Sequence, residues 1–332
     1  MTFLLGGIPE TVESSPRLVP VATENSNADA MIERSASAMT RQAYLLFLMM
    51  GLLWGLPYLF IKIAIVEISP FALAGLRTII ASCVLIPLAI RSGSLGATLK
   101  RWPWAVAFGV MEMAIPWVLV GHAESRVTSG FAGLMIATVP IVGAIVAWFV
   151  GDHHALSPVR LTGLGIGVLG VVALVGLDSL AGQVDVVSVI ELLIVAVCYA
   201  VAPMLISRKM GDLPSISVIA VAILSVAIIY LPLSIGQLQH GLPSLKVGLS
   251  VLVLGLVCTA VAFIGFFKLL ELVGPARSTV ITFLNPAVAV ALGIIVLGEP
   301  LTLGTAIGFP LVLLGSYFAT KSPTIDVAEV AP

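Results

Sequence analysis

Hydrophobic residues in this chain gather into ten long runs that are separated by short polar stretches. Each run has close to the roughly 20 residues that an α-helix needs to cross the hydrocarbon core of a bilayer. Lipid offers the backbone no hydrogen-bonding partner, so each run is predicted to be helical. We therefore expect an all-α integral membrane protein with ten transmembrane helices. The runs cover residues 43–66, 70–90, 103–121, 127–150, 158–177, 186–206, 214–236, 246–269, 276–297 and 301–320.

The composition of the chain agrees with a lipid environment. Hydrophobic residues make up 59% of the 332 residues and charged residues only 10%, whereas a soluble domain has about 25% charged residues. The net charge is -1, and the sequence has no cluster of lysine and arginine of the kind that a phosphate backbone requires, so no nucleic-acid partner is expected. The three cysteines lie inside apolar runs without the spacing of metal ligands, and we predict no metal and no cofactor.

The positive charges lie mostly on one side of the predicted helices. If the N-terminus is cytoplasmic, ten lysine and arginine residues fall on the cytoplasmic side and two on the other side. The ten are Arg34, Arg41, Arg91, Lys100, Arg101, Arg160, Arg208, Lys209, Arg277 and Lys321, and the two are Arg126 and Lys246. Because cytoplasmic loops carry the excess of positive charge, we predict a multi-pass protein of the inner (plasma) membrane with both termini in the cytoplasm.

The runs fall into two similar halves. Residues 283–308 echo residues 135–167, because each stretch has a proline within an apolar run, a short polar break and a glycine-rich run. Prolines and glycines recur 145 or 146 residues apart: Pro87 and Pro232, Pro140 and Pro286, Gly163 and Gly308, Gly170 and Gly315. We predict one five-helix repeat over residues 43–177 and a second over 178–320. A disordered N-terminal tail (1–42) and a C-terminal tail (321–332) flank them.

Five helices per repeat is an odd number, so the second repeat must enter the bilayer from the opposite face. Repeats of inverted topology that meet at a ligand site near the midplane are a recurring design of secondary transporters. We therefore expect two inverted repeats around a central cavity.

The pattern over residues 43–320 resembles the drug/metabolite transporter superfamily, in particular its ten-helix bacterial EamA-type members. The matching residues are Trp54-Gly55 with Lys62, the stretch from Pro70 to Arg77, Pro140, Asn285-Pro286, the stretch from Leu297 to Thr302, and Gly308. The first repeat departs from the second, since His154 stands where Glu299 stands in the second copy. The resemblance implies a cavity lined by the first four helices of each repeat and transport of small metabolites without ATP.

Glu112 is the candidate proton-coupling residue. It lies about nine residues into the third run, which at about 1.5 Å per residue places it roughly 14 Å deep. A carboxylate at mid-bilayer costs about 2.5 to 3.5 kcal/mol on insertion scales, so Glu112 is expected to face a cavity or a partner. Removal from water favours the neutral form of the carboxyl group. The alternative is a structural carboxyl group that is protonated or paired.

Arg77 is a candidate for substrate binding. It lies about seven residues into the second run, too deep for its side chain to reach the interface with certainty. An arginine occupies this place in the family that the chain resembles, and a guanidinium in a cavity wall suits a carboxylate-bearing substrate. The alternative is an arginine that caps backbone carbonyl groups or pairs with Glu67 or Glu112.

Aromatic residues and one asparagine complete the predicted substrate site. Aromatic side chains with a polar atom suit pockets for amphipathic ligands, with ordinary packing as the alternative. Asn285 precedes Pro286, and a proline frees a carbonyl group one turn back, so the amide is expected to line the irregularity. The aromatic residues are Trp54, Tyr58, Trp117 and Tyr199.

Several other features are assigned a structural role. Lys62, Glu191 and Lys268 lie nearer the ends of their runs, where their side chains are expected to reach the interface. The glycine pattern of residues 165–170 matches a dinucleotide-binding fingerprint, but it lies inside an apolar helix with no strand before it. The glycine pairs Gly163 with Gly167 and Gly304 with Gly308 predict close helix packing within the chain or in a homodimer. The sequence Asp152-His153-His154 reads as a solvated loop rather than a metal site.

Taken together, these patterns predict a secondary transporter, not an enzyme, that exports amino acids or related small metabolites by alternating access of the two repeats. Two alternatives remain open. An intramembrane lipid-modifying enzyme usually needs clustered acidic residues or a metal set. A non-transporting membrane receptor is the other alternative.

Overall fold

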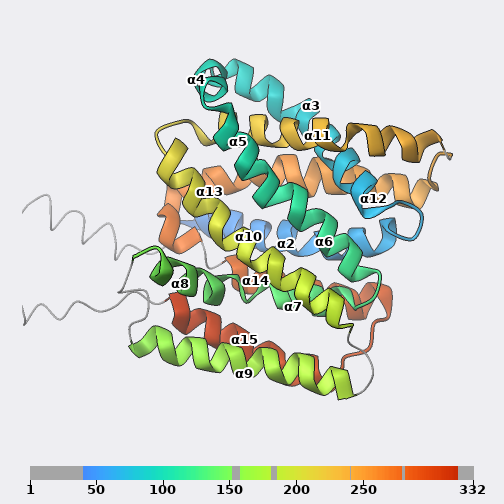
Figure 1. Cartoon of the computed structure of the whole chain (residues 1–332), viewed down its shortest axis with the longest axis vertical. Helices are drawn as coiled ribbons and strands as arrows, with labels where there is room; N and C mark the ends of the chain where they lie inside the picture. The colour runs from blue at the N-terminus through green and yellow to red at the C-terminus, as the bar shows by residue number, and fades with distance from the viewer. Residues whose placement is uncertain (1–39, 152–157, 181–184, 240, 279–280, 321–332) are drawn as a thin grey trace, which may run out of the picture. The chain divides into compact units, whose positions relative to one another are not determined.

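The computed structural model describes residues 40–151, 158–180, 185–239, 241–278 and 281–320, and within these ranges the chain forms helices and no strand (Figure 1). The helices are α2 (Arg41–Ala64), α3 (Pro70–Arg91), α4 (Leu95–Lys100), α5 (Trp102–Gly109), η1 (Val110–Ala114), α6 (Ile115–Glu124), α7 (Ser129–Ile136), α8 (Val139–Phe149), α9 (Pro158–Leu180), α10 (Val186–Met210), α11 (Ser215–Gln239), α12 (Leu245–Gly255), η3 (Leu256–Val261), α13 (Ala262–Ser278), α14 (Ile281–Leu297) and α15 (Leu303–Thr320). The described residues from Arg41 onward belong to one compact unit.

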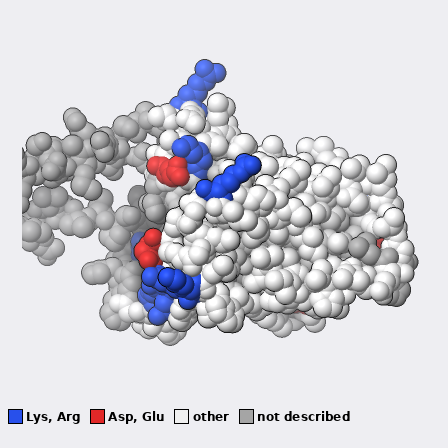
Figure 2. Space-filling view, turned by 90° about the horizontal axis from the view of Figure 1, so that it is seen from above, with Lys and Arg blue, Asp and Glu red and all other residues white. Residues whose placement is uncertain are grey.

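Each predicted apolar run is mostly helical where the structure describes it. Eight helical stretches in the described residues are long and apolar enough to cross a membrane, and the last two runs contain the shorter apolar helices α14 and α15. Large hydrophobic side chains such as Leu169, Val172 and Ile228 are more than 60% exposed on the outside of the helices, as expected where lipid is the solvent. In the view of Figure 2 the charged side chains gather at one end and the remaining described surface carries few charges. The described part of the chain is therefore an all-helical, multi-pass membrane protein.

Two of the long stretches contain a π-helical turn. Residues 110–114 form η1 between α5 and α6, and residues 256–261 form η3 between α12 and α13. Pro116 accounts for the first turn, because a proline lacks the N–H group that would bond to the carbonyl of Glu112 one turn earlier. In the second turn the hydroxyl of Thr259 donates to the carbonyl oxygen of Leu254, five residues earlier, at 2.7 Å.

The fourth run is broken into α7 and α8. The break falls at residues 137–138, directly before Val139-Pro140 at the start of α8. The hydroxyl of Ser316 on α15 donates to the carbonyl oxygen of Ala137 at 2.5 Å. A side chain from another helix thus binds a backbone carbonyl group at the break in the helix.

Three helix pairs join the first half of the sequence to the second. α2 packs along α14, α3 along α11 and α9 along α15, and Figure 1 shows the last two pairs side by side. The glycine stretch of residues 165–170 lies within α9, as predicted. A Cβ atom at Gly315 would fall on the backbone of Gly167, and one at Gly308 would lie 2.9 Å from the carbonyl oxygen of Gly170. These glycines therefore bring α9 and α15 of the same chain together.

Some predictions fall on residues that the structure does not describe. The N-terminal tail lies outside the described residues except for its last three positions, where α2 already begins at Arg41. The sequence Asp152-His153-His154 and the C-terminal tail of residues 321–332 also lie outside them.

Candidate functional site

Arg77 on α3 makes contacts with both halves of the chain. Its side chain is 6% exposed, and Nε donates a hydrogen bond to Oγ1 of Thr259 in η3 at 2.7 Å. The guanidinium carbon lies 3.6 Å from the centre of the Trp117 ring on α6, a cation–π contact. A hydrogen bond on one edge and an aromatic face beneath hold the guanidinium in one orientation.

The backbone around η3 is close-packed against α3. A Cβ atom at Gly255, the residue before η3, would lie 2.6 Å from Cβ of Ile80 and 2.9 Å from the carbonyl oxygen of Arg77. Only glycine allows the helices to approach this closely, and the approach brings Thr259 to Arg77. The Thr259 hydroxyl donates its proton to Leu254, so its oxygen accepts from Arg77.

Two tyrosines lie beside this arginine. Tyr199 on α10 makes a side-chain contact with Trp117 and interacts electrostatically with Arg77 and with Glu112. Tyr58 on α2 is buried and interacts electrostatically with Tyr199 and Arg77. The structure therefore brings together four of the predicted substrate-site residues from α2, α3, α6 and α10.

Glu112 lies in η1, next to the same group of residues. Its Oε2 atom is buried and has no hydrogen-bond partner among the described residues. Glu112 also interacts electrostatically with Tyr199 and Cys198 on α10. The position fits a carboxyl group that carries a proton, because an ionised carboxylate without partners is costly in an apolar interior.

The other two predicted residues have other partners. Trp54 packs against Phe263 and Phe266 on α13, with ring centres 6.1 and 4.8 Å apart. With its NH2 group facing the acceptors, Asn285 donates to the carbonyl oxygens of Gly51 and Ile281 at 3.2 Å each. Asn285 thus ties α14 to α2 in addition to bonding its own helix one turn back.

The structure gives Lys62 partners on another helix. Its ammonium group donates to the carbonyl oxygen of Glu124 at the end of α6 and, at 2.7 Å, to that of Val127 just beyond it. Glu191 is likewise 9% exposed, and its carboxylate pairs with Arg126 at 2.6 Å and His122 at 2.6 Å. Lys268 is exposed, and its side chain pairs with Glu271 at 3.0 Å.

Sequence reasoning missed Glu124. This last residue of α6 is fully buried, and both of its carboxyl oxygens have no hydrogen-bond partner in the described chain. It interacts electrostatically with Lys62 and Glu299. One signal in the sequence could have indicated it. Glu124 lies only three residues after an apolar run, in a connection so short that its side chains stay close to the ends of the two helices.

Glu299 binds the N-terminus of α7. Its carboxylate accepts from the backbone N–H and the hydroxyl of Ser129, both at 2.8 Å, and from the N–H of Gly130 at 3.3 Å. Gly293 has no side chain in the space that the carboxylate fills. A negative charge is favourable at the N-terminus of a helix, so this contact fastens the connection after α14 to α7.

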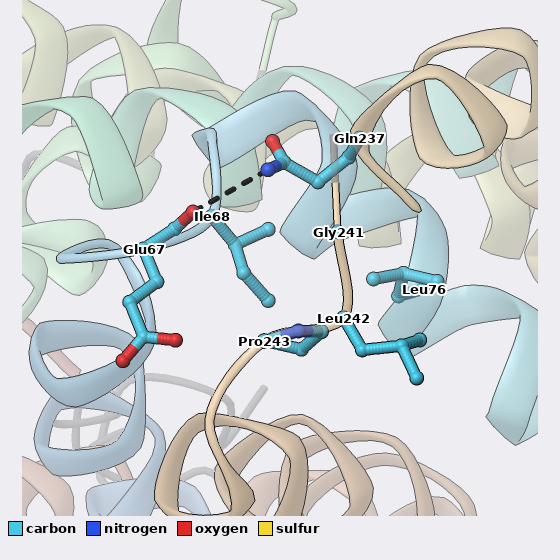
Figure 3. Close-up of a pocket in the computed structure, with 7 residues that line it drawn as sticks. All are labelled: Glu67, Ile68, Leu76, Gln237, Gly241, Leu242 and Pro243. Carbon is cyan, nitrogen blue, oxygen red and sulfur yellow. Dashed lines mark hydrogen bonds between the residues drawn. The ribbon is translucent and has the colours of Figure 1, made fainter. Parts of the chain in front are cut away.

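A small pocket lies at the junction of two connections (Figure 3). It holds about 130 Å³ and is lined by residues of the α2–α3 and α11–α12 connections, by Leu76 of α3 and by Gln237 of α11. Sites for drug-sized ligands hold about 300–1,000 Å³, so this pocket is too small for a metabolite. Ser244 donates to the Glu67 carboxylate at 2.7 Å, which lowers the pKa of Glu67. The junction fastens one half of the chain to the other.

No group of three or more histidine, cysteine, aspartate or glutamate side chains in the described ranges could hold a metal ion.

The sequence matches the model of the EamA-like transporter family twice, over residues 41–176 and 187–321. An uncharacterized transporter of Archaeoglobus fulgidus is 29% identical over 272 residues, which cover 81% of this chain and 95% of that protein. The uncharacterized inner membrane transporter YedA of Escherichia coli K12 is 28% identical over 310 residues, and the match covers 82% of this chain and 91% of that protein. A solved crystal structure shares the fold with a TM-score of 0.60 at 21% identity, covering 83% of this chain and 96% of that one.

Proposed function

The chain belongs to the EamA-like transporter family and is a membrane transporter, and from that premise we propose that it exports amino acids or related small metabolites across the inner membrane without ATP. The name of the Escherichia coli relative supports this membrane. The substrate class rests on Arg77 and its surroundings.

The buried guanidinium of Arg77 is the observation that carries this proposal. Among the described residues Arg77 donates through Nε to Thr259, and its two terminal NH2 groups would bind the ligand. A guanidinium binds a carboxylate through two parallel hydrogen bonds. Trp117 beneath it, with Tyr58 and Tyr199 beside it, offers aromatic surface to the rest of a small substrate.

The transport mechanism that we propose is alternating access of two inverted five-helix repeats, residues 43–177 and 178–320, with ten crossings and both termini in the cytoplasm. The two matches to the family model support two repeats. The π-helical turns support them too, because each follows a glycine, Gly109 or Gly255, at matching positions of the two halves. The turns lie at mid-helix, where broken helices commonly form transporter sites. A homodimer remains a prediction. The glycines of α9 and α15 do not support it, because they pack against each other within one chain.

Glu112 is our candidate for the proton-coupling residue of this cycle. It lies in η1, and it interacts electrostatically with Tyr199 of the arginine cluster. Transport by the wild type should then depend on pH between about 5 and about 8, and the Glu112→Gln variant should lose that dependence. Equal flux of both proteins across this range would remove the proton role.

A thermal-shift comparison tests the substrate class. Amino acids should raise the melting temperature of the purified protein, because a ligand that binds only the folded state stabilises it. The methyl ester of the same amino acid lacks the carboxylate and should give little or no shift. An ester that stabilises the protein as well as its parent amino acid would contradict carboxylate recognition by Arg77.

A further inference from the structure

The environment of Glu124 differs from that of the other carboxylates with described contacts. Glu124 ends α6 and has 0% of its surface exposed, and neither carboxyl oxygen has a hydrogen-bond partner among the described residues. An unpartnered, ionised carboxylate in such a place costs several kcal/mol. A neutral carboxylic acid avoids most of that cost. The arrangement therefore favours the protonated group.

Lys62 supplies a positive charge next to this carboxyl group. Its ammonium group donates to the carbonyl oxygens of Glu124 and Val127, which lie at and just beyond the C-terminal end of α6. Carbonyl groups at a helix C-terminus lack helical partners and attract cations. Lys62 thus sits where a bound cation would sit, within electrostatic range of the Glu124 carboxyl group.

The other charged groups around Glu124 are already engaged. The Glu299 carboxylate, which interacts electrostatically with Glu124, is bound by the N-terminus of α7. On α10, Glu191 pairs with Arg126 and His122 of the α6 end. On α3, Arg77 is held by Thr259 and Trp117. Tyr58 on α2 interacts electrostatically with Glu124, and α7 carries no titratable side chain.

From this geometry we propose that Glu124, beside Lys62, is a proton-binding site of this protein, distinct from Glu112. In the arrangement that the structure shows, Glu124 holds a proton and Lys62 binds the carbonyl oxygens. When the ends of α2 and α6 separate, the O–H bond of Glu124 breaks and the proton passes to a water molecule. The carboxylate that remains is balanced by the ammonium group of Lys62.

Proton binding by Glu124 does not depend on the proposed transport function, whereas a role for it in coupling does. The site lies at the end of the bundle where the connections after α2, α6 and α14 meet, joined by Lys62, Glu124 and Glu299. Protons would therefore reach it from that end rather than from the centre, where Glu112 lies.

Infrared difference spectroscopy of the full-length protein, with the proton as the only ligand, tests the site. The purified wild type in lipid vesicles is titrated from about pH 5 to about pH 10, and the C=O stretching band of a protonated carboxyl group is followed. We expect a band at neutral pH that disappears at alkaline pH. The part of the band that comes from Glu124 should be lost in Glu124→Gln and kept in Glu112→Gln. The Glu112→Gln variant should lose only the part that comes from Glu112.

Two further variants keep the test sharp. Lys62→Met removes the ammonium charge that favours ionisation of Glu124, so its band should persist to higher pH than in the wild type. Glu271→Gln changes an exposed carboxylate and should leave the spectrum unchanged. A wild-type band that Glu124→Gln leaves intact, or the absence of such a band, would overturn the proposal. A Glu124 band in a protein that moves no solute would leave the site standing and count against the transport function instead.

Discussion

Arg77 and Thr259 are 182 residues apart in the sequence, yet Nε of Arg77 donates to Oγ1 of Thr259 at 2.7 Å. The donor lies on a regular helix of the first half and the acceptor in a π-helical turn of the second half. The same guanidinium stacks on Trp117. The contact therefore places a fixed positive charge between the two halves, which is where a transporter of inverted repeats holds its substrate.

Replacing Arg77 by lysine should weaken substrate binding strongly, although the charge is kept. Lysine can neither stack on Trp117 as a plane nor offer two parallel hydrogen bonds. Losing one hydrogen bond to a charged group costs about 1.5–3 kcal/mol, so binding should weaken about 10- to 100-fold. The dissociation constant of the stabilising amino acid measures this. Arg91→Lys, at the exposed end of the same helix, is the control and should bind normally.

Two glycines of α12 should respond oppositely to alanine. A Cβ atom at Gly255 would lie 2.6 Å from Cβ of Ile80 and 2.9 Å from the backbone oxygen of Arg77, so Gly255→Ala must push α12 away from α3. We expect a loss of about 1–3 kcal/mol in the free energy of unfolding. A Cβ atom at Gly248 would meet nothing within 4 Å, so Gly248→Ala should be neutral or gain up to about 1 kcal/mol. Equal melting temperatures for the two variants would contradict the close approach.

The capping role of Glu299 predicts a loss of stability in Glu299→Gln. Glutamine keeps the shape of the side chain but removes the negative charge that the N-terminus of α7 binds, and its NH2 group cannot accept a hydrogen bond. The loss should be about 1–3 kcal/mol in the free energy of unfolding. Denaturation in detergent measures it against Glu271→Gln, whose exposed side chain should matter little. A variant as stable as the wild type would argue against the cap.

Acid should weaken the start of α10 through Asp185. The N–H and hydroxyl groups of Ser188 donate to its carboxylate, and together with Arg126 they hold the pKa of Asp185 below its usual value. The unfolded chain therefore binds this proton more readily, so the stabilisation is present above about pH 4 and is lost as the pH falls below it.

Asp185→Asn separates this effect from helix capping, because asparagine is also a good N-cap residue but does not titrate. The variant should show a shallower fall of melting temperature between about pH 5 and about pH 3 than the wild type. Parallel curves would show that Asp185 contributes nothing to the acid response.

The sequence predicts the helices well because a long apolar run in lipid must satisfy its backbone hydrogen bonds internally, as a helix does. It also predicts Arg77, Trp117, Tyr58 and Tyr199 as substrate-site residues, because charged groups and aromatic groups with a polar atom within an apolar run suit a ligand pocket. The apolar runs do not show how each helix is rotated about its own axis, and so they do not show which neighbour a given side chain faces. Hence the run pattern could not show that Trp54 faces the α13 phenylalanines.

The pair of Lys62 and Glu124 shows a second limit of pattern reading. A lysine near the end of an isolated helix is expected to extend into the interface. In the structure Lys62 binds the carbonyl oxygens of Glu124 and Val127, which lie 62 and 65 residues further along the chain. Only the packing of α2 against α6 brings these groups together, and no local pattern records that contact.

Solute counterflow into proteoliposomes tests the central claim most directly. Vesicles that contain the purified protein are loaded with the amino acid that stabilises it most, and entry of the labelled compound is followed without ATP. We predict uptake by the wild type that empty vesicles do not show and that Arg77→Ala abolishes. Uptake that is unchanged in Arg77→Ala, or firm binding without any movement of the solute, would contradict a transporter built around Arg77.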